Sequence, residues 1–185
     1  MKKENTVQYI LRLTVTLLAI CAVVALALAG VNAITKDKIA AAKKEKTDNA
    51  IKMVLKEATD LKEVPFTDDS GLVTKVYKDD KAGYAVEVAP NGFGGAITLM
   101  VGIGNDGKVL GISIISHAET PGLGAVAAAN TDKGVSFREQ FKGLIGGITI
   151  GDGDNQIAAI SGATISSQAI TDGVNAALEC VKNMG

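Results

Sequence analysis

The sequence predicts an α+β fold in which a single N-terminal transmembrane helix precedes one domain with a mainly antiparallel sheet and a C-terminal helix. Three observations lead to this prediction. Residues 13–35 are uncharged, apolar and polar residues alternate between residues 72 and 117, and the last segment has apolar residues at helical spacing. The 185 residues suffice for one domain of about 100–200 residues together with an anchor.

The composition excludes several classes of function. The chain has 19 basic and 20 acidic residues, so it offers no overall attraction for phosphates and we expect no nucleic-acid partner. Its one histidine, His117, and its two cysteines, Cys21 and Cys180, are too few for a structural zinc site or an iron–sulfur cluster. We therefore expect no metal site and two free thiols, and any redox centre should be organic.

The N-terminal part is predicted to be a short tail, residues 1–12, followed by a transmembrane helix, residues 13–35. At about 1.5 Å per residue, these 23 residues form a helix of about 34 Å, close to the hydrocarbon thickness of a bilayer. A cleaved signal peptide is the alternative, with cleavage after Ala29 or Ala33. The apolar stretch exceeds the usual 7–15 residues or so of a signal peptide, which favours an uncleaved anchor.

Residues 36–60 are expected to form a solvated juxtamembrane helix. The chain has ten basic and six acidic residues up to residue 60, against nine and fourteen beyond it, so positive charge concentrates near the membrane and would favour anionic lipid. A count of flanking lysines and arginines favours a cytoplasmic C-terminal side. Because long domains translocate largely regardless of such charges, the count leaves the orientation open.

The remaining residues, 61–185, are expected to form the domain, and strands are predicted in its first half. Asn105-Asp106-Gly107 predicts a hairpin turn between the last two of them. Gly102, Gly104 and Gly107 match the G-x-G-x-x-G pattern of dinucleotide-binding sites, but a strand follows where that site requires a helix, so we reject it. The predicted strands are residues 72–77, 83–89, 96–104 and 108–117.

Helices are expected later in the domain. Residues 123–129 are rich in alanine, and residues 135–144 place Phe137, Phe141 and Leu144 on one face. A short strand should include residues 157–160. The final helix carries an apolar stripe at i, i+4, i+7, i+8 and i+11, formed by Ile170, Val174, Ala177, Leu178 and Val181.

The first candidate site is the small, hydroxyl-rich segment 161–167 at the mouth of the final helix. The first turn of a helix has unpaired backbone N–H groups and the positive end of the helix dipole, so it holds a phosphate without any lysine or arginine. The alternative is that one of these hydroxyls is merely the helix N-cap, namely that of Thr164, Ser166 or Ser167.

The second candidate site is the loop from His117 to Gly124, in which Pro121 and two glycines fix the backbone and expose amides. His117 beside Glu119 suggests general acid–base catalysis. A hydrolase using Ser161 or Ser166 with His117 is therefore one alternative, although Ser161 does not lie in the G-x-S-x-G pattern of a nucleophile elbow.

Together, the H-x-E-T-P-G-L-G loop at residues 117–124 and the S-G-A-T segment at residues 161–164 resemble the FMN-binding domain of the G subunit of the Rnf electron-transport complex. They are similar also to the C subunit of sodium-translocating NADH:quinone reductase. The resemblance covers most of the chain, and the two motifs in this order are specific. It implies FMN esterified through its phosphate to the Thr164 hydroxyl. The accompanying cofactor-binding residues are expected to be Ser161, Gly162, Ala163, Ile165 and Ser166, with His117, Glu119, Thr120, Gly122, Leu123 and Gly124.

The resemblance also implies a role and a location. The chain would be an electron-carrier subunit of an ion-translocating ferredoxin:NAD oxidoreductase, without turnover of its own. Its partners would be the other membrane subunits of the complex, membrane lipid and, transiently, a flavin transferase. A covalent tether makes sense outside the cytoplasm, where a dissociated FMN would be lost, so the domain is expected on the extracytoplasmic side of the cell membrane.

One position departs from the family pattern. Flavin transferase substrates commonly have an Asp three residues before the serine of the S-G-A-T motif, and Ala158 stands there in this sequence. Asp152 and Asp154 are nearby but out of register. Two further alternatives are the C-type quinone reductase subunit, which the compact length of about 150 residues beyond the anchor disfavours, and a non-redox anchored module for assembly or adhesion.

Overall fold

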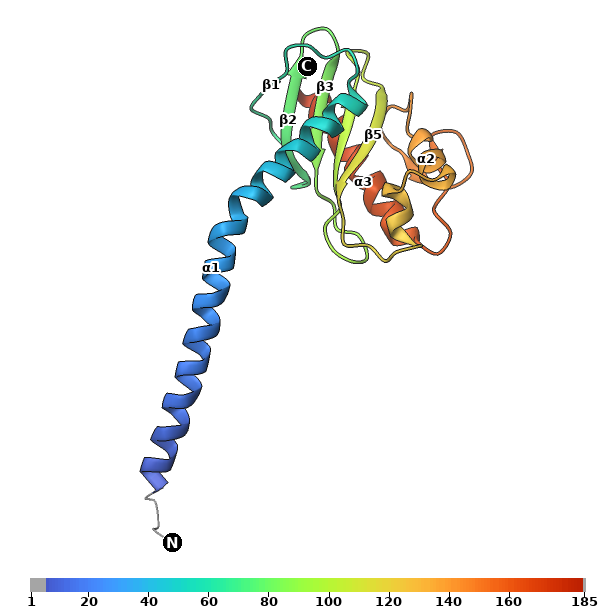
Figure 1. The fold of residues 1–185 in the computed structure, drawn as a ribbon. Coiled ribbons are helices and arrows are strands. Elements are labelled where there is room, and N and C mark those ends of the chain that lie inside the picture. Colours follow the sequence, from blue (N-terminus) through green and yellow to red (C-terminus); the bar gives the residue numbers. More distant parts are fainter. Residues whose placement is uncertain (1–5, 185) are drawn as a thin grey trace. The chain divides into compact units, whose positions relative to one another are not determined.

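The structure is a computed structural model that describes residues 6–184 (Figure 1). Its helices and strands follow one another in an order that places strands first and most helices late. In chain order they are α1 (Thr6–Val54), β1 (Lys62–Glu63), β2 (Val73–Asp79), β3 (Gly83–Val88), β4 (Thr98–Ile103), β5 (Val109–Ser116), the 3₁₀ helix η1 (Gly124–Ala128), α2 (Asp132–Glu139), β6 (Thr149–Ile150), β7 (Gln156–Ile157) and α3 (Thr164–Met184). The predicted α+β fold is confirmed.

Helix α1 is one continuous element of 49 residues, so the segments expected at 13–35 and 36–60 are joined as far as Val54. By length and composition it could cross a membrane. The hydroxyls of Thr14, Thr16 and Thr35 donate to carbonyl oxygens four residues earlier, which satisfies these polar groups inside the helix itself. The chain divides into two compact units, residues up to 45 and residues from 46 onward, and the second contains the sheet.

The five-stranded sheet has the order β1-β2-β3-β4-β5, and every neighbouring pair is antiparallel. The four predicted strands are confirmed as β2 to β5. The predicted hairpin joins β4 to β5: Gly107 has φ +77°, and the Gly104 N–H donates to the Lys108 carbonyl at 2.9 Å. Because β5 follows this turn, the rejection of a dinucleotide site at Gly102 is confirmed.

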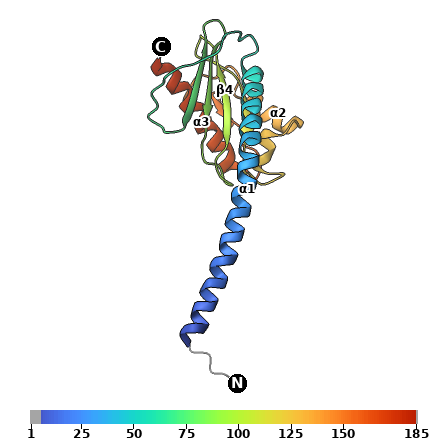
Figure 2. The same cartoon turned by 60° about the vertical axis from the view of Figure 1, so that its left-hand side comes forward.

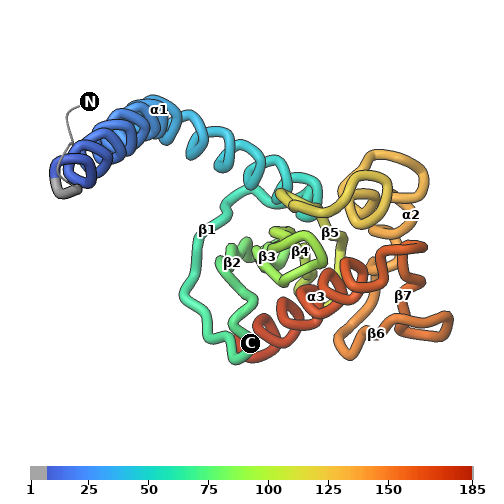
Figure 3. Tube along the Cα trace, turned by 90° about the horizontal axis from the view of Figure 1, so that it is seen from below, coloured from blue at the N-terminus to red at the C-terminus, as the bar shows by residue number. Residues whose placement is uncertain are grey.

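The two faces of the sheet are covered by different helices, α3 on one and the last turns of α1 on the other (Figures 2 and 3). Strand β4 shows why, because successive side chains point to opposite faces. Leu99, Val101 and Ile103 pack in the cluster that includes α3, whereas Met100 packs with Ala50, Ile51 and Val54 of α1. The same alternation brings Gly102 so close to Val54 that a Cβ there would overlap the helix.

The turn after α1 is fixed by the buried carboxylate of Asp79. Its Oδ2 accepts the N–H groups of Asp60 at 2.9 Å and Thr59 at 2.8 Å, and its Oδ1 accepts those of Lys81 and Ala82 at 2.9 Å each. These amides, that of Asp60 first, stabilise the charged form and hold the pKa of the Asp79 carboxyl well below its ordinary value.

The segment between the sheet and α3 differs in part from the prediction. The helix expected at 123–129 is the 3₁₀ helix η1, and the one expected at 135–144 is the shorter α2, whose N-cap Thr131 accepts the Gly134 N–H. The expected C-terminal end is wrong because Gly143 adopts φ +81° and donates its N–H to the Val109 carbonyl of β5. Phe137 and Phe141 still meet edge to face, with ring centroids 5.6 Å apart.

The final helix, α3, is the long amphipathic helix that the periodicity predicts. Every member of the predicted apolar stripe is buried, and Ile170, Val174 and Ala177 are completely inaccessible to solvent. The strand expected at 157–160 is only β7, which pairs in parallel with β6. Through α3, the sheet's core fixes the position of the segment that precedes Thr164.

Candidate functional site

A cavity of about 380 Å³ lies where three segments of the domain meet, and this volume falls within the usual range for small-molecule sites. The segments are the β3–β4 loop, the loop after β5, and the start of α3. Two larger cavities, of about 620 and 960 Å³, contain none of the predicted site residues. The smaller cavity is lined by Phe93, Glu119, Thr120, Leu123, Gly124, Gly162, Ala163, Thr164, Ile165 and Ser166.

The start of α3 supplies backbone donors and a hydroxyl. Gly162 adopts φ +74°, and the first amide to bond back along the helix is that of Ser167, which donates to the Ala163 carbonyl at 2.9 Å. The amides of Thr164, Ile165 and Ser166 precede that bond, so they are the N–H groups that a helix start offers to a ligand.

Thr164 is exposed at the cavity, and within residues 6–184 its hydroxyl makes no hydrogen bond. The alternative that Thr164 or a neighbouring serine merely caps the helix does not fit, because α3 begins at Thr164 itself. Ser167 acts differently: its Oγ accepts the Ile160 N–H and donates to the Ala163 carbonyl, both at 3.0 Å, and so ties the preceding loop to the helix. Thr164 is thus the exposed first residue of α3 in the cavity lining.

Glu119 joins all three segments. Its side chain is buried, Oε1 accepts the Gly94 N–H of the β3–β4 loop at 2.8 Å, and Oε2 accepts the hydroxyl of Ser166 on α3. The packing around this carboxylate is tight: a Cβ placed on Gly92 or on Gly124 would overlap Glu119. The carboxylate therefore connects the walls of the cavity to one another.

Three predicted site residues do not line the cavity: His117, Gly122 and Ser161. His117 is exposed, and its Nδ1 accepts the Glu119 N–H at 3.2 Å, so it shapes the loop. Ser166, for its part, donates to Glu119. Neither interaction is the serine–histidine bond that a hydrolytic pair requires, so the hydrolase alternative gains no support.

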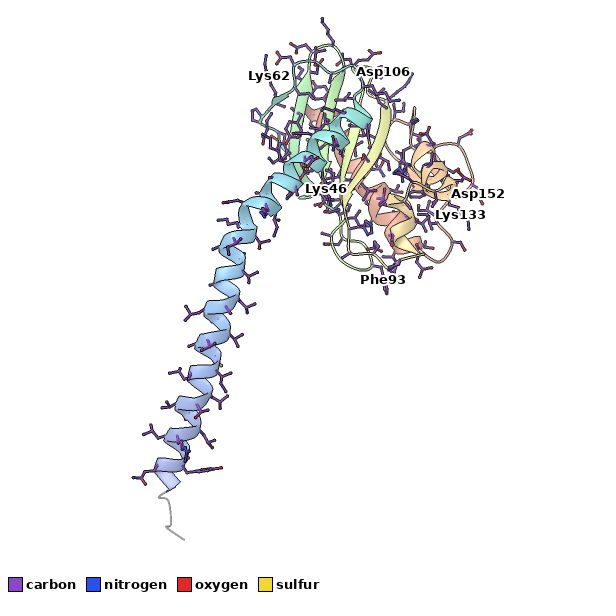
Figure 4. The ribbon with its side chains drawn as sticks, in the orientation of Figure 1. Lys46, Lys62, Phe93, Asp106, Lys133 and Asp152 are labelled. Atoms are coloured by element: carbon purple, nitrogen blue, oxygen red, sulfur yellow. The ribbon has the colours of Figure 1, made fainter. Side chains whose placement is uncertain are left out.

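Phe93 lines the cavity although neither predicted motif contains it. Figure 4 labels this side chain on the domain. Its side chain is 72% exposed, which is unusual for a large aromatic residue in a folded domain. The available signal was an aromatic residue among glycines in the loop Gly92-Phe93-Gly94-Gly95, where a Cβ on Gly94 would overlap the Ala118 backbone. With the exposed side chains of Leu123 and Ile165, Phe93 forms an apolar rim.

The residues present fit FMN. The rim and the glycine-rich walls suit a planar, largely apolar ring, and the amides at the start of α3 suit a phosphate. Glu119 is the only charged residue among the cavity-lining residues that the structure describes, so an anion there would be held by backbone dipoles rather than by a cation.

Ala158 stands where the family pattern has Asp, and it is exposed. Its backbone N–H and carbonyl both form hydrogen bonds with the side chain of Gln140. The Ala158 N–H donates to Gln140 Oε1 at 2.8 Å, and Gln140 Nε2 donates to the Ala158 carbonyl at 3.3 Å. The departure thus changes a surface side chain and leaves the segment anchored to the residue that follows α2.

Comparisons with known proteins agree with the two motifs. A family model described as the FMN-binding domain matches residues 92–179, and one described as the RnfG N-terminal region matches residues 1–54. The G subunit of the sodium-translocating ferredoxin:NAD oxidoreductase complex of Acetobacterium woodii is 32% identical, over 95% of this chain and 93% of its own length.

Two further relatives cover nearly the whole chain. The G subunit of the proton-translocating ferredoxin:NAD oxidoreductase complex of Clostridium ljungdahlii is 32% identical over 98% of this chain and 96% of its own length. The G subunit of the ion-translocating oxidoreductase complex of Methanosarcina acetivorans is 34% identical over 93% of this chain and 94% of its own length. The recognition made from the motifs is confirmed, and the chain belongs to the family of G subunits of ion-translocating oxidoreductase complexes.

Proposed function

We propose that this chain relays electrons through FMN that is esterified by its phosphate to the Thr164 hydroxyl. As a member of the G-subunit family with an FMN-binding domain, it is a flavoprotein subunit of an ion-translocating ferredoxin:NAD oxidoreductase. The covalent bond and its position are our proposal. No turnover independent of the complex is expected.

The observation that carries the proposal is the position of Thr164. It is an exposed residue of a mostly apolar cavity, and it begins the helix turn whose amides would face an attached phosphate. A phosphodiester there places negative charge at the positive end of the α3 dipole, which stabilises it. A threonine elsewhere on α3 would lack this environment: Thr171, for example, is fully buried and donates to the Ser167 carbonyl.

Each wall of the cavity has a distinct task. FMN, when bound, supplies one- and two-electron chemistry that the side chains of this domain do not provide. Phe93, Leu123 and Ile165 would exclude water from the ring, while Gly162 would let the backbone approach the cofactor and Gly124 leaves room for Glu119 and Ser166. The Thr164 oxygen fixes the attachment point, and Glu119 fixes the spacing of the walls.

We further propose that α1 anchors the chain by a single span, with the flavin domain on the extracytoplasmic side. An apolar helix of this length fits single-pass anchoring in a membrane complex. The proposed partners are the other membrane subunits, lipid around the span and its lysines, and a flavin transferase that acts once. A covalent bond would keep FMN on a domain from which a dissociated cofactor would be lost.

The attachment is tested by in-gel flavin fluorescence and intact-mass measurement on protein made with an active flavin transferase. Wild type should carry one FMN through denaturation. Thr164→Val should carry none, and Thr164→Ser, which keeps a hydroxyl, should regain it. Thr120→Val is the matched control, because Thr120 lines the same cavity but would not be the acceptor. Fluorescence that survives in Thr164→Val would refute the assignment.

A further inference from the structure

We propose that Glu119 is a positioning residue that both holds the cavity together and lowers the reduction potential of the bound flavin. This inference rests on the proposed attachment of FMN beside Thr164. Glu119 is the one charged residue in the described cavity lining, and its side chain is buried. Burial of a carboxylate is costly unless its oxygens are hydrogen-bonded, so a buried one calls for a reason.

The bonds of Glu119 account for the positioning role. Its two oxygens reach the Gly94 amide and the Ser166 hydroxyl, which lie on different segments, 25 and 47 residues away in the chain. One oxygen is bonded to an N–H and the other to a hydroxyl, so both oxygens of the buried side chain have a partner. Removing the carboxylate would release the Phe93-bearing loop from the start of α3.

The charge accounts for the effect on potential. Coulombic interaction is much stronger in a site walled by apolar groups than in water, and among the ten lining residues there is no lysine or arginine to offset the anion. Reduction adds electron density to the flavin ring, so a fixed negative charge at the wall disfavours it. The bound cofactor should therefore have a more negative midpoint potential than it would have beside a neutral residue.

A second buried glutamate provides the matched control. Glu87 on β3 is buried to a similar degree, and its Oε1 accepts the Thr74 hydroxyl at 3.0 Å, but it does not line the cavity. Glu87→Gln thus removes one buried negative charge elsewhere in the same domain. It separates an effect of charge at the cavity from a general effect of losing a buried carboxylate.

The experiment is a spectroelectrochemical titration of the flavin-loaded full-length protein. Glu119→Gln should shift the midpoint potential to more positive values, whereas Glu87→Gln should leave it at the wild-type value. Equal potentials in wild type and Glu119→Gln, or an equal shift in Glu87→Gln, would overturn the proposal. A wild type without FMN would instead refute the attachment itself, so the two failures are distinguishable.

A second variant covers the case in which Glu119→Gln takes up no FMN. Ser166→Ala keeps the carboxylate but removes the hydroxyl that shares its charge, so the potential should move the other way, to more negative values. An unchanged or more positive potential in Ser166→Ala would contradict the charge argument. In the flavin-free protein, Glu119→Ala should speed amide exchange at Gly94 more than Glu87→Ala does, and equal exchange would remove the positioning role.

Discussion

Two buried carboxylates, Asp79 and Glu119, do opposite things in the same domain. Asp79 accepts hydrogen bonds from four backbone amides, which belong to the two short segments 59–60 and 81–82. Glu119 accepts one amide and one hydroxyl from distant segments, and it lines a cavity. The first holds the segment after α1 to the turn between β2 and β3, while the second connects the walls of the cavity.

The difference shows how to separate a structural acid from a functional one. A carboxylate whose oxygens are all taken up by backbone amides of turns is an internal cap, comparable to those that close helix ends. One that accepts a side-chain hydroxyl as well and borders a cavity is available to act on a ligand. Changes around Glu119, around Asp79 and at the rim of the cavity should therefore have different effects.

The largest loss of bound flavin is expected from a change at Gly124, whose backbone lies against Glu119. Gly124→Ala would push a Cβ into both Glu119 and Ser166, an overpacking that costs about 1–3 kcal/mol and deforms the cavity. Flavin content, measured by absorbance per protein, should fall to a small fraction of wild type. Gly111→Ala is the control, since its Cβ would meet only Lys142 Cε at 3.8 Å. Full flavin loading of Gly124→Ala would show that Glu119 tolerates a displaced wall.

Disruption of Asp79 should weaken the fold without emptying the site. Asp79→Ala leaves the amides at Thr59, Asp60, Lys81 and Ala82 without their acceptor, so the denaturant midpoint should drop clearly. The flavin content of the folded fraction should match wild type. A variant that kept its midpoint but lost flavin would reverse the roles assigned to the two acids.

Lowering the pH should produce a smaller loss of stability through the same Asp79 carboxylate. The pKa of Asp79 is lower in the folded than in the unfolded chain, so its contribution to stability is present above the unfolded value of about 4 and is lost as the pH falls toward the folded value. Wild type should lose unfolding free energy below about pH 4. Asp79→Asn should show a flatter profile when both are unfolded in denaturant across that range, and parallel profiles would contradict the assignment.

The smallest effect is expected at the rim. Phe93→Ala should keep FMN attached but expose one side of the ring, with a loss of about 0.5–1.5 kcal/mol of aromatic contact. Iodide should then quench the flavin fluorescence more strongly. Ile145→Ala, at another exposed apolar residue that lies outside this cavity, should leave quenching unchanged. Equal quenching in wild type and Phe93→Ala would remove Phe93 from the ring contacts.

Much of the fold could be predicted because its signals are local. Alternation located the four long strands, and the stripe from Ile170 to Val181 located α3. The early end of α2 could not be predicted, since Gly143 turns there in order to pair with β5, which is a tertiary contact. β1 was also missed, because two exposed residues, Lys62 and Glu63, carry no alternation.

In the candidate site, too, contiguous segments could be predicted and tertiary contacts could not. Nine of the twelve predicted residues line the cavity, because the two motifs are contiguous segments that the fold brings together. His117 lies outside it because its ring turns back to the Glu119 amide. Phe93 comes from a third segment, and its place beside the others depends on the Gly94–Glu119 bond, which no sequence spacing reveals.

The strand order of the five-stranded sheet affects how this protein folds during synthesis. Each strand pairs with its neighbour in sequence, so the sheet can assemble progressively during synthesis, at low contact order. The helix that begins at Thr164 comes last, and without it the core on one side of the sheet loses Ile170, Val174 and Ala177. With FMN attached to Thr164 as proposed, cofactor loading would be a late event in biogenesis, because a chain truncated before this helix would have neither a finished core nor the attachment residue.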